Sequence, residues 1–315
     1  MLKLHFINVA EGDAILVEDC GEQAVTRLLV DTGRADVGTS PGSLRLTCAA
    51  YLKKLGITQI DHLVLTHLHV DHAAGLTAVL DTVRIGHVYQ SYFPTEGAAP
   101  ITVDRTEERH VVELADDLNR YLADCGRMRD AGTVFHETLQ DAAVTVSDGL
   151  TMHLRTAPRW GVLGQNAVYD AMLHGERLPE DIRYWASEAR NPHSLRVELA
   201  YAGRLVRLDG DYLAEGAERE ETTRCDILKV AHHGDKKSMT PGLAEAMRPE
   251  YAVICCQQAY VASKERPCRR VVEDLETHGA QVLYTDGFAW EGETPRRAES
   301  IVMTNSEAGE ITLEE

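Results

Sequence analysis

The sequence has little positive charge. Of 315 residues, 32 are Lys or Arg and 50 are Asp or Glu, so the formal net charge is −18 at pH 7. A protein that follows a nucleic-acid backbone over a long distance needs clustered cations to neutralise phosphates. This balance therefore argues against a broad basic face. It leaves open a phosphate-containing substrate that is reached by bound metal ions, because these bring their own positive charge.

Long apolar runs, signal-peptide features in the first residues printed and CxxC cysteine pairs are also missing. No apolar run approaches the roughly 20 residues of a membrane span, so we expect no membrane segment. The N-terminal stretch MLKLHFINVAEGDAILVED lacks the basic and apolar regions of a signal peptide and predicts a strand from about residue 2. The seven cysteines form no CxxC pair, which is typical of reduced thiols. These absences predict a cytoplasmic protein.

The patterning that is present predicts one large α/β domain over residues 1–315. Apolar residues make up 44% and charged residues 26%, the balance of a protein with a full core. We find no internal repeat and no Pro/Gly linker. Strands are expected at 2–9, 14–18, 27–30, 62–66, 195–201, 205–208, 226–230, 251–255 and 281–284, and helices at 43–55, 73–80 and 269–278.

The stretch at about 90–190 is predicted to be an insertion. Residues 106–126 have helical spacing, residues 144–154 read as a hairpin around Asp148-Gly149, and residues 160–190 are helical and polar without site chemistry. We expect this insertion to lie over one face as a lid or an interface.

The strongest functional signal is the segment His67-Leu68-His69-Val70-Asp71-His72, which follows a short apolar strand. In an extended segment, residues i and i+2 point the same way, so His67 and His69 can bind one ion together. The chain then turns into a helix, which directs Asp71 and His72 to a different side and suits a second ion. Imidazole and carboxylate ligands favour Zn, with Mn or Fe as alternatives.

HLHVDH resembles the HxHxDH signature of the metallo-β-lactamase-fold hydrolases. More narrowly, the chain is similar to the hydrolase domain of ComEC-type DNA-uptake proteins and their stand-alone relatives. NVAEGDAILV resembles that group's VGQGDAILI, LVDTG its strand ending in DTG, NPHSLRVELAYAGRLVRLDGD its NNNSLVL and LLTGD, and DILKVAHHGDKKS its LKVxHHGSxxS. The resemblance implies an αββα sandwich of two mixed sheets flanked by helices.

The resemblance also assigns ligands outside the first motif. Asp211 falls on the carboxylate that bridges two ions in this fold, and an acid just after an apolar strand is well placed for that task. His193 stands where many families of the fold have their third histidine ligand. The implied arrangement is one ion on His67, His69 and His193, and a second on Asp71 and His72, with Asp211 between the two.

One position departs from the family pattern. Where relatives have the histidine of YGHP, this chain has Arg266. Arginine has no lone pair to donate near neutral pH. Either His232 or His233 takes that place, or the second ion is weakly held or absent. Arg266 is instead a candidate to clamp a substrate phosphate or carboxylate.

His232-His233-Gly234 follows the strand at 226–230, and the resemblance places this pair at the active site, in contact with the scissile group or its leaving oxygen. With Asp71, these two histidines are the predicted catalytic residues. Lys236 is a candidate for contact with the substrate phosphate. Asp13 and Asp31 are expected to hydrogen-bond to ligating histidines.

The favoured hypothesis is a metal-dependent phosphodiesterase or nuclease that attacks with a metal-bound water or hydroxide, with a nucleic acid or nucleotide as substrate. It requires a locally positive groove, for which Lys229, Lys236, Lys237 and Arg266 are the candidates. A hydrolase of a lactone, ester or thioester is the first alternative, and an apolar pocket formed by residues 160–190 would favour it. The second is a non-catalytic metal-binding regulatory module with a degenerate second site. The oligomeric state is open.

Overall fold

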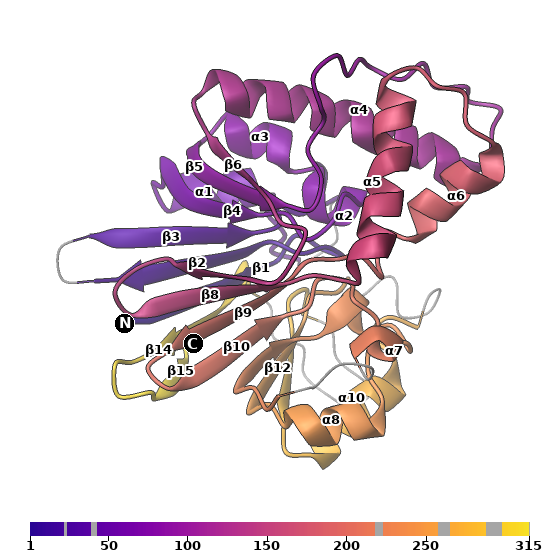
Figure 1. Ribbon diagram of the computed structural model, residues 1–315. Coiled ribbons are helices and arrows are strands. Elements are labelled where there is room, and N and C mark those ends of the chain that lie inside the picture. The colour runs from indigo at the N-terminus through magenta and orange to yellow at the C-terminus, as the bar shows by residue number, and fades with distance from the viewer. Residues whose placement is uncertain (22–23, 39–42, 218–222, 258–264, 288–297, 315) are drawn as a thin grey trace.

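Two β-sheets lie face to face with helices on their outer sides (Figure 1). The computed structural model describes residues 1–21, 24–38, 43–217, 223–257, 265–287 and 298–314. Within these ranges the first sheet has eight strands in the order β15-β14-β1-β2-β3-β4-β5-β6. Their bounds are β1 Leu2–Ile7, β2 Ile15–Cys20, β3 Val25–Val30, β4 Gln59–Val64, β5 Arg84–Gln90, β6 Val134–Glu137, β14 Ser300–Asn305 and β15 Ile311–Leu313.

The second sheet is also mixed. Within the same ranges it has seven strands in the order β13-β12-β11-β10-β9-β8-β7. Their bounds are β7 Ala142–Thr145, β8 Leu150–Arg155, β9 Arg196–Tyr201, β10 Arg204–Leu208, β11 Ile227–Lys229, β12 Tyr251–Ile254 and β13 Gln281–Tyr284. β3 runs parallel to β4, and β10 runs parallel to β11, so both sheets present carboxyl ends of parallel strands.

The helices cover the outer faces of both sheets. Their bounds are α1 Cys48–Lys54, α2 Val70–Ala73, α3 Leu76–Leu80, α4 Arg109–Asp130, α5 Arg159–Leu173, α6 Glu180–Glu188, α7 Ala214–Ala217, the 3₁₀ helix η1 Ala231–Gly234, α8 Pro241–Met247 and α10 Arg269–Thr277. In Figure 1, α3 and α4 lie beyond the first sheet, and α8 and α10 beyond the second. No helix in the described ranges is long and apolar enough to cross a membrane.

Three apolar layers follow from this arrangement. Phe6, Met152 and Leu199 are buried between the two sheets. Leu63 and Leu114 are buried where the first sheet meets its helices, and Leu228 and Val271 where the second sheet meets α8 and α10. Strands with both faces buried explain the nearly continuous apolar runs in the sequence. The predicted αββα sandwich is confirmed.

The stretch predicted as an insertion is more closely built into the sandwich than the sequence indicated. β6 joins the first sheet, and β7 and β8 join the second. The predicted hairpin is correct, since β7 pairs antiparallel with β8. The predicted polar helical segment consists of α5 and α6, and α6 packs against α4 and α5. Short strands that pair with distant partners carry little local signal, which is why the sequence did not show their place in the sheets.

Candidate metal centre

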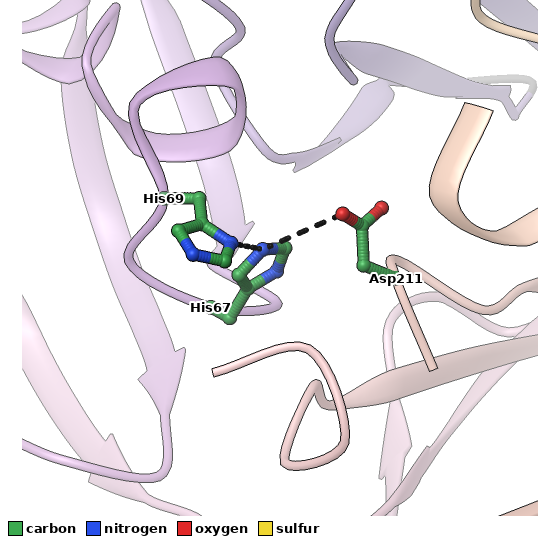
Figure 2. Close-up of side chains that lie close together, drawn as sticks. All are labelled: His67, His69 and Asp211. Atoms are coloured by element: carbon green, nitrogen blue, oxygen red, sulfur yellow. Dashed lines mark hydrogen bonds and ion pairs between the residues drawn. The ribbon is translucent and has the colours of Figure 1, made fainter. Parts of the chain in front are cut away.

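The first group of possible metal ligands consists of His67, His69 and Asp211. The two histidines lie on the loop that joins β4 to α2, and Asp211 lies on the loop after β10. Nε2 of His67 is 2.8 Å from Nδ1 of His69 and 3.8 Å from Oδ2 of Asp211 (Figure 2). One ligand atom from each residue lies within 4.8 Å of the others. Imidazole nitrogens and a carboxylate oxygen at this spacing are suited to zinc or a similar ion.

The second group consists of Asp71, His72 and His233. Nε2 of His233 is 3.3 Å from Oδ2 of Asp71. The ligand atoms of the three residues again lie within 4.8 Å of one another, and Asp13, His72 and Asp211 satisfy the same criterion. His72 and His233 are fully buried. The structure thus supports the prediction that the HLHVDH segment serves two neighbouring sites.

Asp211 lies between the two groups and directs one oxygen toward each. Its Oδ1 is 3.2 Å from Nε2 of His72 and 3.8 Å from Nε2 of His233. Its Oδ2 is 3.8 Å from Nε2 of His67 and 3.8 Å from Nε2 of His232. This is the placement that a carboxylate shared by two ions requires.

Unsatisfied buried atoms show that the residues fit metal ions. Within the described ranges, Nε2 of His72, Nε2 of His233 and Oδ1 of Asp211 are buried and lack a hydrogen-bond partner. Leaving a buried polar atom unsatisfied costs about 1–3 kcal/mol, and more for a charged group. The three atoms face one another, so a cation between them would satisfy all three. The chemistry of the donor atoms and the unsatisfied buried atoms therefore both indicate a metal site.

Asp31, at the carboxyl end of β3, fixes the orientation of His72. Its Oδ2 is 2.8 Å from Nδ1 of His72 and 2.7 Å from the hydroxyl of Thr66, while its Oδ1 accepts from the backbone N–H of Thr66 at 2.7 Å. A ligating histidine commonly donates its second ring N–H to a carboxylate in this way, which leaves the first nitrogen for the metal. The predicted supporting role of Asp31 is consistent with these contacts.

His233 is held by a carbonyl group. Its Nδ1 is 2.8 Å from the carbonyl oxygen of Cys255 at the end of β12, so Nε2 is free to face Asp71. Both His232 and His233 have left-handed backbone conformations, with φ of 48° and 56°. Such strain in residues other than glycine is concentrated at functional sites. In this conformation the two neighbouring rings face different oxygens of Asp211.

A buried lysine, Lys229, contacts residues of the metal centre. Lys229 is fully buried at the end of β11, and its ammonium donates to Asp13 and, at 2.9 Å, to the carbonyl of Gly210. Burial disfavours the charge, but Asp13 and Asp211 outweigh it and raise the pKa of Lys229. The sequence offered Lys229 as part of a positive groove. In the structure it lies inside the protein and neutralises carboxylates of the site.

The histidines of the centre differ in their affinity for protons. Burial, followed by the positive field of neighbouring histidines, lowers the pKa of His67 well below 6.5. Burial also opposes protonation of His72, but the carboxylates of Asp211, Asp13 and Asp31 outweigh it and raise that pKa well above 6.5. The pKa of Asp211 is well below its usual range, because His72, His232 and His233 outweigh its burial. Asp211 is thus ionised, as a metal ligand must be.

His193 does not take the predicted place beside His67 and His69. Its Nδ1 is 3.0 Å from Oε1 of Gln165 on α5, and within the described ranges it belongs to no group of converging ligand atoms. Ser194 reaches the site instead, with its hydroxyl 3.2 Å from Nδ1 of His67. The loop packs the His193 ring against α5, and that packing directs the ring away from the metal groups.

At the second group, which the sequence left open because of Arg266, the histidine that converges with Asp71 and His72 is His233. Arg266 lies nearby, with Nε 3.1 Å from Oδ2 of Asp235 and Nη1 3.3 Å from Oε1 of Glu11. Its charge is therefore shared with two carboxylates. Lys236 is exposed on the following turn. Contact of Arg266 and Lys236 with a substrate remains a prediction.

His232 lies at the edge of the centre. Its Nε2 is 3.2 Å from Nδ2 of Asn191, and its side chain keeps 15% of its surface exposed. Burial, followed by the charge of Arg266, lowers its pKa below 6.5 although Asp211 acts in the opposite sense. His232 is therefore neutral at pH 7 and carries one ring N–H.

Two facing mixed sheets, with a centre of His and Asp side chains at the carboxyl ends of their parallel strands, form the arrangement that the resemblance to the metallo-β-lactamase fold implied. The family model of the metallo-beta-lactamase superfamily matches residues 9–147. ComE operon protein 3 from Bacillus subtilis (strain 168) is 23% identical over 298 residues, which are 90% of this chain and 32% of that protein. The chain thus spans about a third of the length of this relative.

Solved structures of similar shape include Zn²⁺-bound PqqB from Methylobacterium extorquens, with 12% identity, a TM-score of 0.48, and 91% of this chain and 98% of that chain covered. Igni18, a metallo hydrolase from the archaeon Ignicoccus hospitalis, has 15% identity and a TM-score of 0.47. The match covers 96% of this chain and 97% of that chain. The resemblance to the metallo-β-lactamase superfamily, and more narrowly to the ComEC-type group, is confirmed. Fold and site together support a metal-dependent hydrolase.

Proposed function

We propose that this chain is a phosphodiesterase that works with two divalent ions, zinc in the first instance. The single observation that supports a two-ion centre best is the Asp211 carboxylate, whose oxygens face different histidines. The first ion would be held by His67, His69 and Asp211, and the second by Asp71, His72, His233 and Asp211.

When bound, such ions lower the pKa of water and offset the negative charge that develops on phosphoryl oxygens. The residues of the chain supply orientation and protons. Asp31 and the carbonyl of Cys255 hold His72 and His233 in the ring orientation that presents Nε2. His232, neutral and partly exposed, donates a hydrogen bond to the leaving oxygen. Arg266 lies at the same edge of the site, where its charge is balanced by Glu11 and Asp235.

The substrate that fits best is a small phosphodiester of the nucleotide class. The chain carries a net charge of −18, Lys229 is buried, and Arg266 is paired with Glu11 and Asp235. A long nucleic acid would need cations along its backbone. A small substrate needs charge compensation only where it reacts, which the metal centre provides. The resemblance of the motifs to those of ComEC-type DNA-uptake proteins supports a substrate related to nucleic acid, although this chain spans only about a third of ComE operon protein 3.

The test combines metal content with turnover. The zinc-loaded protein should contain about two ions per chain and hydrolyse bis-p-nitrophenyl phosphate. His67→Ala and Asp211→Ala should lose activity and at least one ion. Asp130→Asn, at an exposed position on α4, is the control and should keep both ions and full activity. One ion or none, without turnover after addition of Zn or Mn, would exclude a phosphodiesterase.

Hydrolysis of a carboxylic ester, lactone or thioester is the second candidate. It is favoured by a cavity beside the metal centre whose walls include Trp160, Leu213 and Tyr212, with no Lys or Arg in the described part of the wall. The same zinc-loaded protein should be offered p-nitrophenyl butyrate and an acyl thioester. Turnover of these in preference to the phosphodiester would select this candidate.

A further inference from the structure

A cavity of about 390 Å³ lies next to the metal centre and has no task in the proposed reaction. Its walls include Trp160 at the start of α5, His193 on the loop before β9, and Tyr212 and Glu215 after β10. Cavities of 300–1,000 Å³ are typical of small-molecule sites. The volume is therefore enough for part of a substrate.

Several residues that line the cavity are chain neighbours of residues in the metal centre. Tyr212 directly follows Asp211, whose backbone N–H donates to the hydroxyl of Ser194 at 3.3 Å. Ser194 in turn follows His193 and contacts His67. Asn191, on the same loop, is 3.2 Å from His232. Two loops thus contact the metal ligands on one side and line the cavity with their neighbouring residues.

The chemistry of the cavity suits an uncharged ring. Within the described residues, Lys and Arg are absent from its walls, and the carboxyl-bearing residue there is Glu215, which would repel a phosphate. Trp160 is 80% exposed, which is unusual for so large an apolar side chain. A flat aromatic face that remains open beside a reaction centre can stack against a planar group of the substrate.

Two glycines leave room for the rings that line the cavity. A Cβ atom at Gly216 would lie 2.6 Å from Cζ of Tyr212, and one at Gly161 would lie 2.6 Å from Nε2 of His193. The Tyr212 ring is also covered by Arg196, whose guanidinium carbon is 4.2 Å from the ring centroid. The cavity wall is therefore held in place rather than formed by loose side chains.

We infer that this cavity binds a planar aromatic group of the substrate, stacked on Trp160, while the phosphate of the same molecule reaches the metal centre. The identity of that group as a nucleobase rests on the proposed phosphodiesterase function. Stacking on an aromatic side chain tolerates every base, since each base has a flat face. Trp160 then determines substrate preference without taking part in the reaction.

The test is equilibrium binding by calorimetry to the zinc-loaded protein, with AMP and ribose 5-phosphate as probes. AMP should bind about tenfold or more tightly than ribose 5-phosphate, because it alone carries a base. Trp160→Ala should remove this preference, and Trp160→Phe should keep most of it. Tyr184→Ala, at an exposed aromatic residue on α6 outside the cavity, should leave it unchanged.

Equal binding of both probes to the wild type, or an unchanged preference in Trp160→Ala, would overturn the inference. The result is independent of turnover. A preference that depends on Trp160, in a protein that does not hydrolyse phosphodiesters, would support the cavity and refute the proposed reaction. Turnover of a phosphodiester without any preference for AMP would support the proposed reaction and refute the role of the cavity.

Discussion

Asp31 joins two segments of the metal centre although it is not in a ligand group. It accepts hydrogen bonds from Thr66, which precedes the first ligand, and from Nδ1 of His72. Its backbone is left-handed, with φ of 57°, a conformation that Asp tolerates better than most residues. The sequence indicated a supporting role from the LVDTG motif, but only the structure shows which histidine it supports.

Asp31→Asn should weaken zinc binding by about 10–100-fold. The amide keeps the size of the side chain, but one of its two acceptors becomes a donor that faces another N–H or O–H. The affinity can be measured by competition with a chromophoric chelator. The matched control is Asp130→Asn, which should bind zinc like the wild type. Equal affinities in the two variants would show that Asp31 does not orient His72.

At the scale of the elements, charged pairs cross the strands of the first sheet. Glu18 on β2 lies opposite Lys3 on β1 and Arg27 on β3. Its Oε1 accepts from Nε of Arg27 at 2.9 Å, and its Oε2 is 3.3 Å from Nε2 of His5. The hydrogen bond with His5, followed by that with Arg27, lowers the pKa of Glu18 below 4.5 although burial acts against it.

Glu18→Gln should therefore destabilise the protein near neutral pH and have less effect in acid. A carboxyl whose pKa is lower in the folded state contributes stability above its unfolded value of 4.5, and this contribution disappears as the pH falls through the lowered pKa. Urea unfolding of the wild type and of Glu18→Gln at about pH 7 and about pH 3 measures this contribution to the free energy of unfolding. A difference in unfolding free energy that is the same at both values would contradict the assignment.

At the scale of the whole molecule, the metal centre connects the two sheets. His67, His69, Asp71 and His72 follow a strand of the first sheet, whereas Asp211 and His233 follow strands of the second. Ions bound here would join the halves of the sandwich and satisfy the buried atoms of His72, His233 and Asp211. Metal binding should therefore contribute directly to global stability.

Removal of the ions with a chelator should lower the melting temperature, and zinc at about a hundred times its Kd should restore it by about 5 °C. The reason is that the folded state has the assembled ligand set and the unfolded chain does not. Differential scanning calorimetry measures the shift. The rise in melting temperature on addition of zinc should be much smaller in Asp211→Ala than in the wild type, and equal to that of the wild type in Asp130→Asn. A melting temperature that does not respond to zinc would count against a metal centre that joins the sheets.

The αββα sandwich was implied by the resemblance to the metallo-β-lactamase fold, whereas the individual strands and the core of the site were predicted for a local reason. Strand periodicity and apolar runs report burial, and most predicted strands lie within a few residues of their observed bounds. His67, His69, Asp71 and His72 are neighbours in the chain, so their chemistry is visible without any knowledge of packing. Asp211 was recognisable because an acid directly follows an apolar strand in a motif of the resembled group.

The tertiary structure decided what depends on the direction of a side chain or on contact between distant segments. His193 and His233 were both candidates from the sequence, but packing against Gln165 turns His193 away, and the left-handed backbone of His233 brings its ring to Asp71. The place of β6 to β8 in the sheets and the cavity beside Trp160 were likewise decided by packing. Residue order specifies which groups are available, whereas the direction of each ring depends on contacts between segments far apart in the chain.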